Sequence, residues 1–415
     1  MGSQTILANL PRARQVMERR GLDGLVAELP INVYYLSGYW GMLMSAERFD
    51  AAFLAVLPRR EDLPAVLVMP TMELRRLASE GGTWMPEIVA YSSPLDDETE
   101  GLQSDGKPYD GWPVRPGAEL TERERAWMAI VRRHRDRVAA NARGALVRAL
   151  RLAGLDSGRL GTDDLRIEGW ARAGGLGGVS CAVDANVFNE IRRVKTPAEL
   201  ELLRAAAHVN EASLRAAADA LVEGASWEEV ERSYFVAMAE RGGQGSYFIC
   251  GAGGLPAGRV RRGEPMMLDA LGTYRHYHGD FGRCAVVGEP PREMRTRHAA
   301  LLAGWEAIQP LLRPGPRYSE IAGTAVESIR KAGFPEFMYA TPHGVGLEHT
   351  DDPKPPGRLP GAQWDTVLEP GMVLNVDLPF TEIGWGSVHI EDTVHITADG
   401  FETLTSPDFG ILCRP

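Results

Sequence analysis

Two aspartates in the second half of the chain lie at a spacing that could bring their carboxylates together. Residues 266–274 form an apolar run that contains Asp269, and a glycine-containing turn separates it from a second run that begins near Asp280. If the two runs form a hairpin, both carboxylates converge at one end of it. The structural alternative is a turn cap at one aspartate and an ordinary ion pair between Asp280 and Arg283.

A histidine among glycines supplies a second kind of group. His343 lies between Pro342 and Gly344, and Gly346 and His349 follow within six residues. Glycines let the backbone approach a ligand closely and leave space around an imidazole. His343 is therefore a candidate metal ligand or proton carrier, although a histidine taken alone is more often structural.

Two further acids, Asp377 and Glu391, each lie within an apolar, β-branched segment. A buried carboxylate without a partner is costly, and a bound cation is one way to offset that cost. Carboxylates together with one imidazole form the oxygen-rich ligand set that suits divalent ions, which lower the pKa of bound water and polarise a carbonyl. The predicted chemistry is hydrolysis, and the candidate metal ligands are Asp269, Asp280, His343, Asp377 and Glu391.

The first part of the chain is predicted to form an α/β layer. Between residues 10 and 92, helical patterns alternate with short β-branched or aromatic runs at 25–27, 32–36, 52–56 and 65–69. Residues 93–120 are rich in Pro, Gly and Asp and are expected to form a long loop, either over solvent or as a lid that contacts a site through Tyr109 and Trp112. One helix is expected from about 122 to 151.

A domain boundary is expected near residue 190. Thr196, Pro197 and Glu199 together form a helix start, since Thr caps, Pro fits the first turn and Glu favours the positive end of the helix dipole. After residue 246 strand patterns dominate, with helices expected at 292–312 and 318–332. The expected domains are 1–190, an α/β domain, and 191–415, an α+β domain.

Composition excludes several classes of partner. The 415 residues carry 45 Lys and Arg against 56 Asp and Glu, and a net charge of -11 argues against a nucleic-acid surface. The four cysteines show no CxxC spacing, and the first residues lack the pattern of a signal peptide. Apolar stretches are far shorter than the ~20 residues of a membrane helix, so a cytoplasmic protein without membrane contact is expected.

The three acidic and histidine stretches, in this order, resemble the pita-bread metallohydrolase family. That family includes methionine aminopeptidase, Xaa-Pro aminopeptidase, prolidase, creatinase and a dimethylsulfoniopropionate lyase. Residues 193–199 resemble the family's domain entry, and residues 32–38 resemble the N-terminal domain of its prolidase and creatinase branch. The resemblance implies a creatinase/prolidase-type α/β N-terminal domain over 1–190 and an α+β pita-bread catalytic domain over 191–415.

The resemblance also assigns roles to the candidate ligands. It makes Asp269 a chelating ligand of one metal, His343 a ligand of the other, and Asp280 and Glu391 the bridging carboxylates. Asp377 stands where the family usually has glutamate, so a site with one ion is an alternative to a site with two. Two divalent ions per subunit (Mn, Fe, Co or Zn) and a homodimer are what the family implies.

Two departures from the family bear on the substrate. Residues 253–260 lack the turn histidine that the peptidases carry, and His389 stands where prolidase-like enzymes place an arginine. Both argue against ordinary Xaa-Pro cleavage, because they remove substrate-binding groups. His349 approximately matches a second family histidine that contacts the substrate. The candidate substrate-binding residues are His349, His389, His278 and Tyr274, with His276 and His278 alternatively being surface turn residues.

The favoured interpretation is a metal-dependent hydrolase that acts on an amide or related C–N bond of a small or short peptide-like substrate. In this mechanism Glu391 accepts the proton of the attacking water, His349 stabilises the oxyanion, and His343 completes the catalytic group. One alternative is a creatinase-like or dimethylsulfoniopropionate-lyase-like enzyme that acts on a non-peptide molecule. A second alternative is a catalytically silent binding protein on the same fold.

Overall fold

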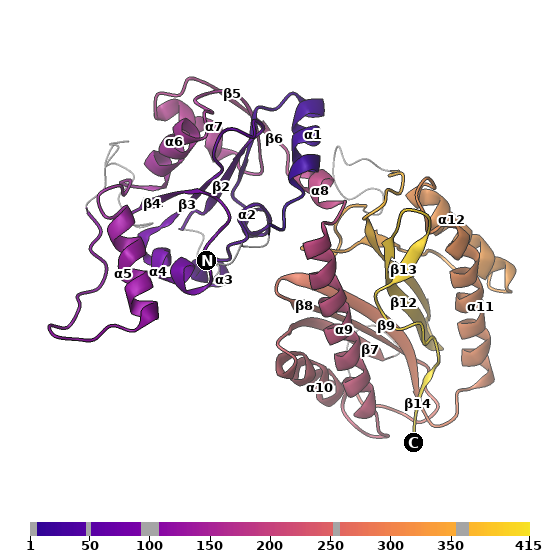
Figure 1. Cartoon of the computed structure of the whole chain (residues 1–415). Helices are drawn as coiled ribbons and strands as arrows, with labels where there is room; N and C mark the ends of the chain where they lie inside the picture. Colours follow the sequence, from indigo (N-terminus) through magenta and orange to yellow (C-terminus); the bar gives the residue numbers. More distant parts are fainter. Residues whose placement is uncertain (1–5, 47–50, 93–107, 252–257, 354–364) are drawn as a thin grey trace. The chain divides into compact units, whose positions relative to one another are not determined.

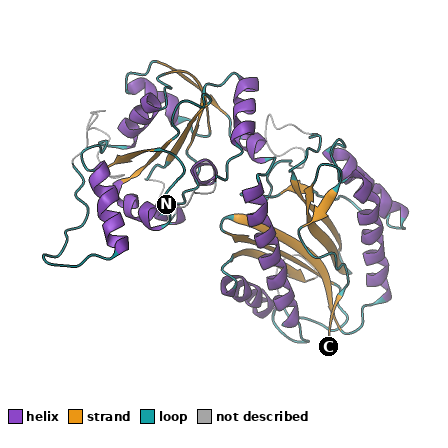
Figure 2. Ribbon diagram, in the orientation of Figure 1, coloured by secondary structure: helices purple, strands orange, loops and turns teal. Residues whose placement is uncertain are grey.

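A computed structural model of the chain describes residues 6–46, 51–92, 108–251, 258–353 and 365–415. The chain divides into two compact units, Met1–Ile191 and Arg192–Pro415 (Figure 1). Each unit has its own mixed sheet with helices packed against it, as the colouring by secondary structure in Figure 2 shows. Among the described residues, none of the helices combines the length and apolar character required to cross a membrane.

The first unit is built on a six-stranded sheet in the order β4-β3-β2-β1-β5-β6. β1 is antiparallel to β2, and β2 to β3, whereas the outer pairs are parallel. Its strands are β1 Gly24–Ala27, β2 Leu54–Pro58, β3 Val66–Pro70, β4 Glu87–Tyr91, β5 Ser157–Thr162 and β6 Gly178–Val183. Its helices are α1 Leu10–Arg20, α2 Pro30–Ser37, α3 Met42–Ser45, the 3-10 helix Thr71–Glu73, α4 Leu74–Ser79, α5 Glu122–His134, α6 Ala142–Leu152 and α7 Arg166–Ala173, while α8 Asn186–Arg192 ends at the boundary.

The α/β layer predicted for this unit is present, but two of its elements differ from expectation. Residues 32–36, expected as a β-branched and aromatic strand, belong to helix α2, which begins at Pro30 and ends at Ser37, where Gly38 follows in a left-handed conformation. The single helix expected over 122–151 is two helices. Between them Ala139 pairs with the backbone of β4 at Ala90 and Tyr91, and Asn141 caps α6.

The loop expected at 93–120 is described only from residue 108. From there to the cap of α5 at Thr121 the backbone is neither helix nor strand. Trp112 is 71% exposed and stacks against Arg75 at 3.9 Å from guanidinium carbon to ring centroid, within the same unit. The remainder of the loop, 93–107, lies outside the described residues, so its role as a lid stays a prediction.

The second unit contains an eight-stranded sheet in the order β10-β11-β12-β9-β8-β7, with β13 beside β12 and β14 beside β9. Helices α9 and α10 pack on the half that contains β7 to β9, and α11 and α12 on the half that contains β11 and β12 (Figure 1). The strands are β7 Gln244–Gly251, β8 Met266–Tyr274, β9 Tyr277–Val287, β10 His343–Gly344, β11 Val373–Glu382, β12 Gly386–Ile396, β13 Phe401–Thr403 and β14 Leu412–Arg414. The helices are α9 Pro197–Asp219, α10 Trp227–Glu240, α11 Arg292–Ile308, the 3-10 helix Gln309–Leu311 and α12 Tyr318–Lys331.

The start of α9 has the predicted capping arrangement. The Thr196 side chain accepts a hydrogen bond from the Glu199 amide, and the Glu199 side chain accepts one from the Thr196 amide. Each strand of the sheet alternates between two faces. Leu268, Ala270 and Phe281 face the core under α9 and α10, and Val376, Leu378 and Ile390 belong to the core with α11 and α12. The residues between them therefore point to the opposite face.

Candidate functional site

Strand register gathers the predicted acids on the sheet face that is turned away from the helices. Asp269 pairs with Gly282 across β8 and β9, Gly282 pairs with Glu391 of β12, and Glu391 pairs with Asp377 of β11. Directly opposed residues of neighbouring strands share a face. Asp280, two residues before Gly282, shares that face as well, so all four predicted acids come together from four adjacent strands.

A first group of possible metal ligands consists of Asp280, His343 and His349, each offering one atom within 4.8 Å of the others. His349 Nε2 lies 3.0 Å and His343 Nε2 3.6 Å from Asp280 Oδ2. Asp280 is fully buried and His343 nearly so. The pKa of His349 is raised: burial opposes the charged ring, but the Asp280 carboxylate outweighs that opposition.

A second group consists of Asp269, His389 and Glu391, again with one atom each within 4.8 Å. His389 Nε2 lies 3.7 Å from Glu391 Oε2. Burial raises the pKa of Asp269 to about 7, with Asp280 and Asp377 acting in the same direction and His389 against it. Burial, followed by repulsion from Asp280 and Asp269, also raises the pKa of Glu391 well above its usual value.

Asp377 is on the same face but belongs to neither group. Its Oδ1 lies 2.7 Å from His389 Nε2, and its Oδ2 accepts a 2.5 Å hydrogen bond from Thr341 Oγ1. Burial would raise the pKa of Asp377, yet these two partners outweigh it and the pKa is lowered. The residue predicted as a fifth ligand is thus already held by two side chains.

Polar side chains behind the groups hold the acids in place. Asn375 Nδ2 donates a 2.5 Å hydrogen bond to Glu391 Oε1, and Thr393 Oγ1 donates to Asn375 Oδ1 at 3.2 Å. Arg283 makes a two-pronged ion pair with the buried Asp392, with both oxygens at 2.9 Å. The ion pair between Asp280 and Arg283, weighed as a structural alternative, is therefore not formed, since Arg283 is directed to Asp392.

The segment that carries His343 and His349 is fixed by buried ion pairs. Lys195 Nζ lies 3.2 Å from Asp351 Oδ2, and Arg192 lies 2.9 Å from Glu348 and 3.3 Å from Asp351. Lys195, Arg192 and Asp351 are at most 1% exposed at the side chain. The motif that was expected to open the second domain thus also positions the histidine segment.

The other predicted substrate-binding residues are placed differently from one another. His278 precedes Asp280 on the same face, its ring centroid 6.4 Å from that of His349. Tyr274 is on the opposite face, packed against the core under α9 and α10, so the structure does not bring it to the site. His276 lies in the turn between β8 and β9 with a φ of 71°. Residues 253–257, where the turn histidine is missing, lie outside the described part of the chain.

Sequence reasoning missed one aromatic residue on this face. Tyr247 pairs with Leu271, two residues beyond Asp269, and its ring centroid lies 6.1 Å from that of His349. Burial, then the charges of Asp269 and Asp280, raises its pKa. Strand alternation would have indicated its face, but an irregularity in register between Gly245 and Tyr247 shifts the pattern by one residue.

The site has unsatisfied buried atoms of the kind that a cation would satisfy. Within the described residues, Asp269 Oδ1, both Asp280 oxygens and Glu391 Oε2 are buried without a well-formed hydrogen bond. Unpaired buried carboxylate oxygens are costly, and oxygen-rich groups with imidazole suit divalent ions. The residues therefore fit the metal that the sequence predicts.

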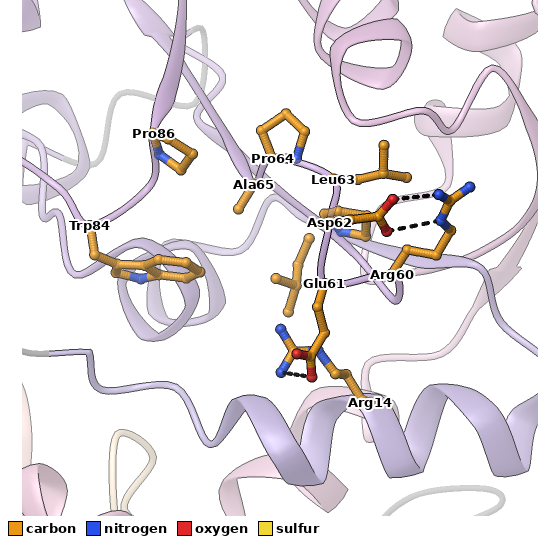
Figure 3. Close-up of a pocket in the computed structure, with 11 residues that line it drawn as sticks. Arg14, Arg60, Glu61, Asp62, Leu63, Pro64, Ala65, Trp84 and Pro86 are labelled. Atoms are coloured by element: carbon orange, nitrogen blue, oxygen red, sulfur yellow. Dashed lines mark hydrogen bonds and ion pairs between the residues drawn. The ribbon is translucent and has the colours of Figure 1, made fainter.

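A separate pocket lies in the first unit and has no part in this arrangement. It is an open pocket of about 310 Å³, lined by residues that include Arg60, Asp62 and Trp84 (Figure 3). Arg14 forms an ion pair with Glu61, and Arg60 forms one with Asp62, among the residues that line it. It contains none of the predicted site residues.

Comparison with known proteins finds one family match in each of the two units. Residues 201–398 match the family model described as metallopeptidase family M24, and residues 10–109 match the creatinase/prolidase N-terminal domain. The Xaa-Pro dipeptidase of Pyrococcus furiosus is 30% identical over 239 residues, which cover 55% of this chain and 67% of the relative. The probable dipeptidase PepE of Mycobacterium bovis is 27% identical over 249 residues, which cover 57% and 65%.

Solved structures show the same fold over nearly the whole chain. The prolidase from Pyrococcus furiosus has a TM-score of 0.66 at 21% identity and covers 95% of this chain and 99% of its own. The Xaa-Pro dipeptidase from Bacillus anthracis has a TM-score of 0.70 at 19% identity and covers 97% and 98%. The predicted two-part fold is confirmed. The chain therefore belongs to metallopeptidase family M24, a family of divalent-metal-dependent hydrolases, and carries the creatinase/prolidase N-terminal domain.

Proposed function

We propose that the protein is a dinuclear metallohydrolase that cleaves the amide bond of a dipeptide or a similarly small amide. The observation that carries this proposal is the pair of adjacent ligand groups, each with buried oxygens that have no well-formed hydrogen bond. Relatives named dipeptidase favour hydrolysis over the creatinase-like or lyase-like reaction and over a silent binding protein. Two ions of manganese, iron, cobalt or zinc would be held by Asp269, Asp280, His343 and Glu391.

The residues around the ligands have roles that follow from their contacts. Divalent ions bound here supply a water of lowered pKa and polarise the substrate carbonyl. Glu391 would accept the proton from the attacking water, and Asn375 donates to its Oε1, which leaves Oε2 as the oxygen that faces the ions and their water. His349, 35% exposed at the side chain, donates from its ring to the oxyanion. His343 is buried, and its Nε2 lies 3.6 Å from Asp280 Oδ2.

The sharpest test replaces Glu391 by Gln, which preserves its size and its bond with Asn375 but removes the proton acceptor. Hydrolysis of Xaa-Pro dipeptides, other dipeptides, small cyclic amides, ureas and betaines is measured with added Mn²⁺ for both proteins. Loss of turnover by at least about 10²-fold with an unchanged circular dichroism spectrum is expected. Turnover retained in E391Q contradicts the assigned role, and wild-type turnover of betaines or ureas alone favours the non-peptide alternative.

A homodimer, implied by the family resemblance, and a cytoplasmic location, expected from the composition, stay predictions. Light scattering of the purified protein tests the first of these. A single-chain mass at micromolar concentration would contradict it.

A further inference from the structure

The environment of His389 differs from that of a residue that only contacts substrate. Its side chain is 1% exposed, and it lies on β12 two residues before Glu391, on the same face. Its Nε2 is engaged by Asp377 Oδ1 at 2.7 Å. Its other ring nitrogen, Nδ1, is buried and has no hydrogen-bond partner among the described residues. A buried imidazole nitrogen without a partner is an unusual cost that a ligand can remove.

The space beside Nδ1 is also the space beside the acids of the second group. Gly282 lies between Asp269 and Glu391 in register. A Cβ atom on Gly282 would lie 2.3 Å from His389 Nδ1 and 2.8 Å from Glu391 Oε2. The absence of a side chain at position 282 therefore leaves Nδ1 and a carboxylate oxygen next to one another, both without partners.

We propose that His389 binds, through Nδ1, the metal ion of the second group, called here the second ion, and that Asp377 supports His389 from outside the coordination sphere. This inference rests on the proposed function, since it concerns an ion of the same site. Metal-binding histidines commonly donate their other ring N–H to a carboxylate, which fixes the tautomer and the ring orientation. Asp377 Oδ1 is that acceptor, and Thr341 fixes its second oxygen.

The alternative ligand for this ion is Asp377 itself, and the contacts argue against it. Both of its oxygens are within hydrogen-bond distance of side-chain donors, whereas Nδ1 of His389 has none within the described residues. Asp377 has no atom in either group of mutually close ligand atoms, whereas His389 does. The second ion would accordingly be held by Asp269, His389 and Glu391, with one neutral nitrogen in place of a carboxylate oxygen.

Two replacements of His389 test the roles of its two ring nitrogens separately. The amide of Gln reaches the position of Nε2, so H389Q preserves the contact with Asp377 but has no atom at Nδ1. The amide oxygen of Asn overlaps the position of Nδ1, so H389N preserves a ligand atom and loses the contact with Asp377. D377N preserves the shape of the outer partner while removing its charge.

The experiment loads metal-free protein with Co²⁺ and measures the ions bound per chain by calorimetry. Proton NMR of the Co²⁺ protein then counts the strongly shifted, exchangeable N–H signals, one for each coordinated imidazole. We expect H389Q to lose one ion and one such signal. H389N and D377N are expected to keep the ion with affinity about 10–100-fold weaker.

Each outcome decides between the possibilities. Unchanged Co²⁺ uptake and signal count in H389Q, with loss of an ion in D377N, would overturn this inference and make Asp377 the ligand. Wild-type protein that takes up no Co²⁺ would overturn the proposed function as well. If H389Q does not fold, nitrogen-15 labelling of histidine in the wild-type protein still identifies the bound atom, and coordination of His389 through Nε2, or no coordination, would overturn the inference.

Discussion

Lys195 and Asp351 form an ion pair in which neither side chain is exposed, with 3.2 Å between Nζ and Oδ2. A Cβ atom on Gly346 would lie 2.6 Å from the Asp351 carboxylate and 2.9 Å from Nζ, so the pair lies directly against the segment between His343 and His349. The position of both histidines thus depends on an interaction with the start of α9, about 150 residues earlier in the chain.

Replacing Lys195 by Met should lower the free energy of unfolding by up to about 3–5 kcal/mol, because it removes one of the two buried cations that pair with Asp351 and leaves Arg192, at 3.3 Å, as the other. Urea denaturation measures the change. The matched control is K331M, since the Lys331–Glu327 pair is more than two-thirds exposed and should contribute under about 1 kcal/mol. Similar losses in the two variants would contradict the importance assigned to the buried pair.

Replacing Gly282 by Ala should abolish binding of the second ion, because the added methyl group occupies the space between His389 Nδ1 and Glu391 Oε2. Calorimetric titration with Mn²⁺ measures the loss. Gly323 of α12 is the control, since a Cβ atom there meets nothing within 4 Å and Ala in a helix stabilises by roughly 0.5–1 kcal/mol. Normal metal uptake by G282A would place the ion elsewhere.

Asp269 should make the free energy of unfolding of the metal-free protein depend on pH. The pKa of Asp269 is about 7 in the folded state and near 3.8 in the unfolded state. Between these two pH values the folded state therefore keeps a proton on Asp269 that the unfolded state has already released. The contribution of Asp269 to the free energy of unfolding is fully present below about pH 4 and is lost as the pH rises to 7. D269N lacks this proton, so its stability relative to wild type should rise over the same range by on the order of a few kcal/mol.

Urea denaturation of both chelator-treated proteins at intervals from pH 4 to pH 8 measures that difference. Added Mn²⁺ should reverse its sign, because wild-type protein then gains the binding free energy of an ion that D269N holds more weakly. A difference that stays constant across the pH range would show that Asp269 is ionised in the metal-free protein.

Replacing His349 by Ala should reduce kcat by about 10²–10³-fold while the number of bound ions stays the same, because the ring acts as a donor to the oxyanion. Steady-state kinetics and metal analysis of the same preparation separate the two properties. Loss of one ion in H349A would instead make the ring a ligand, as its proximity to Asp280 also permits.

Most of the fold was predictable because periodicity and helix-start signals are local. The Thr196-Pro197-Glu199 start of α9 is formed as expected, whereas residues 32–36 have strand-like composition but form α2. Pro30 at the first turn and Gly38 after the last residue were the local signals for that helix. The break between α5 and α6 depends on pairing of Ala139 with β4, which is a tertiary contact that local patterns do not contain.

The candidate site was predictable as a set of residue types but not as a set of partners. Sequence order and apolar surroundings brought out Asp269, Asp280, His343 and Glu391. The close contact between His389 and Asp377 required the register of β11 against β12, in which His389 is diagonal to Asp377 and opposite Pro379. Single-residue irregularities such as the one before Tyr247 cannot be read from alternation alone.

The two halves of the second sheet meet along a very short seam. β9 and β12 share one ladder pair, Glu391 with Gly282, whereas the hairpins on either side are paired along their length. Asp269 and Asp280 belong to one half, and Glu391 and His343 to the other. Ions coordinated by acids from both halves would link the two halves across this seam. Removal of the ions should therefore weaken the association of the two halves at the candidate site.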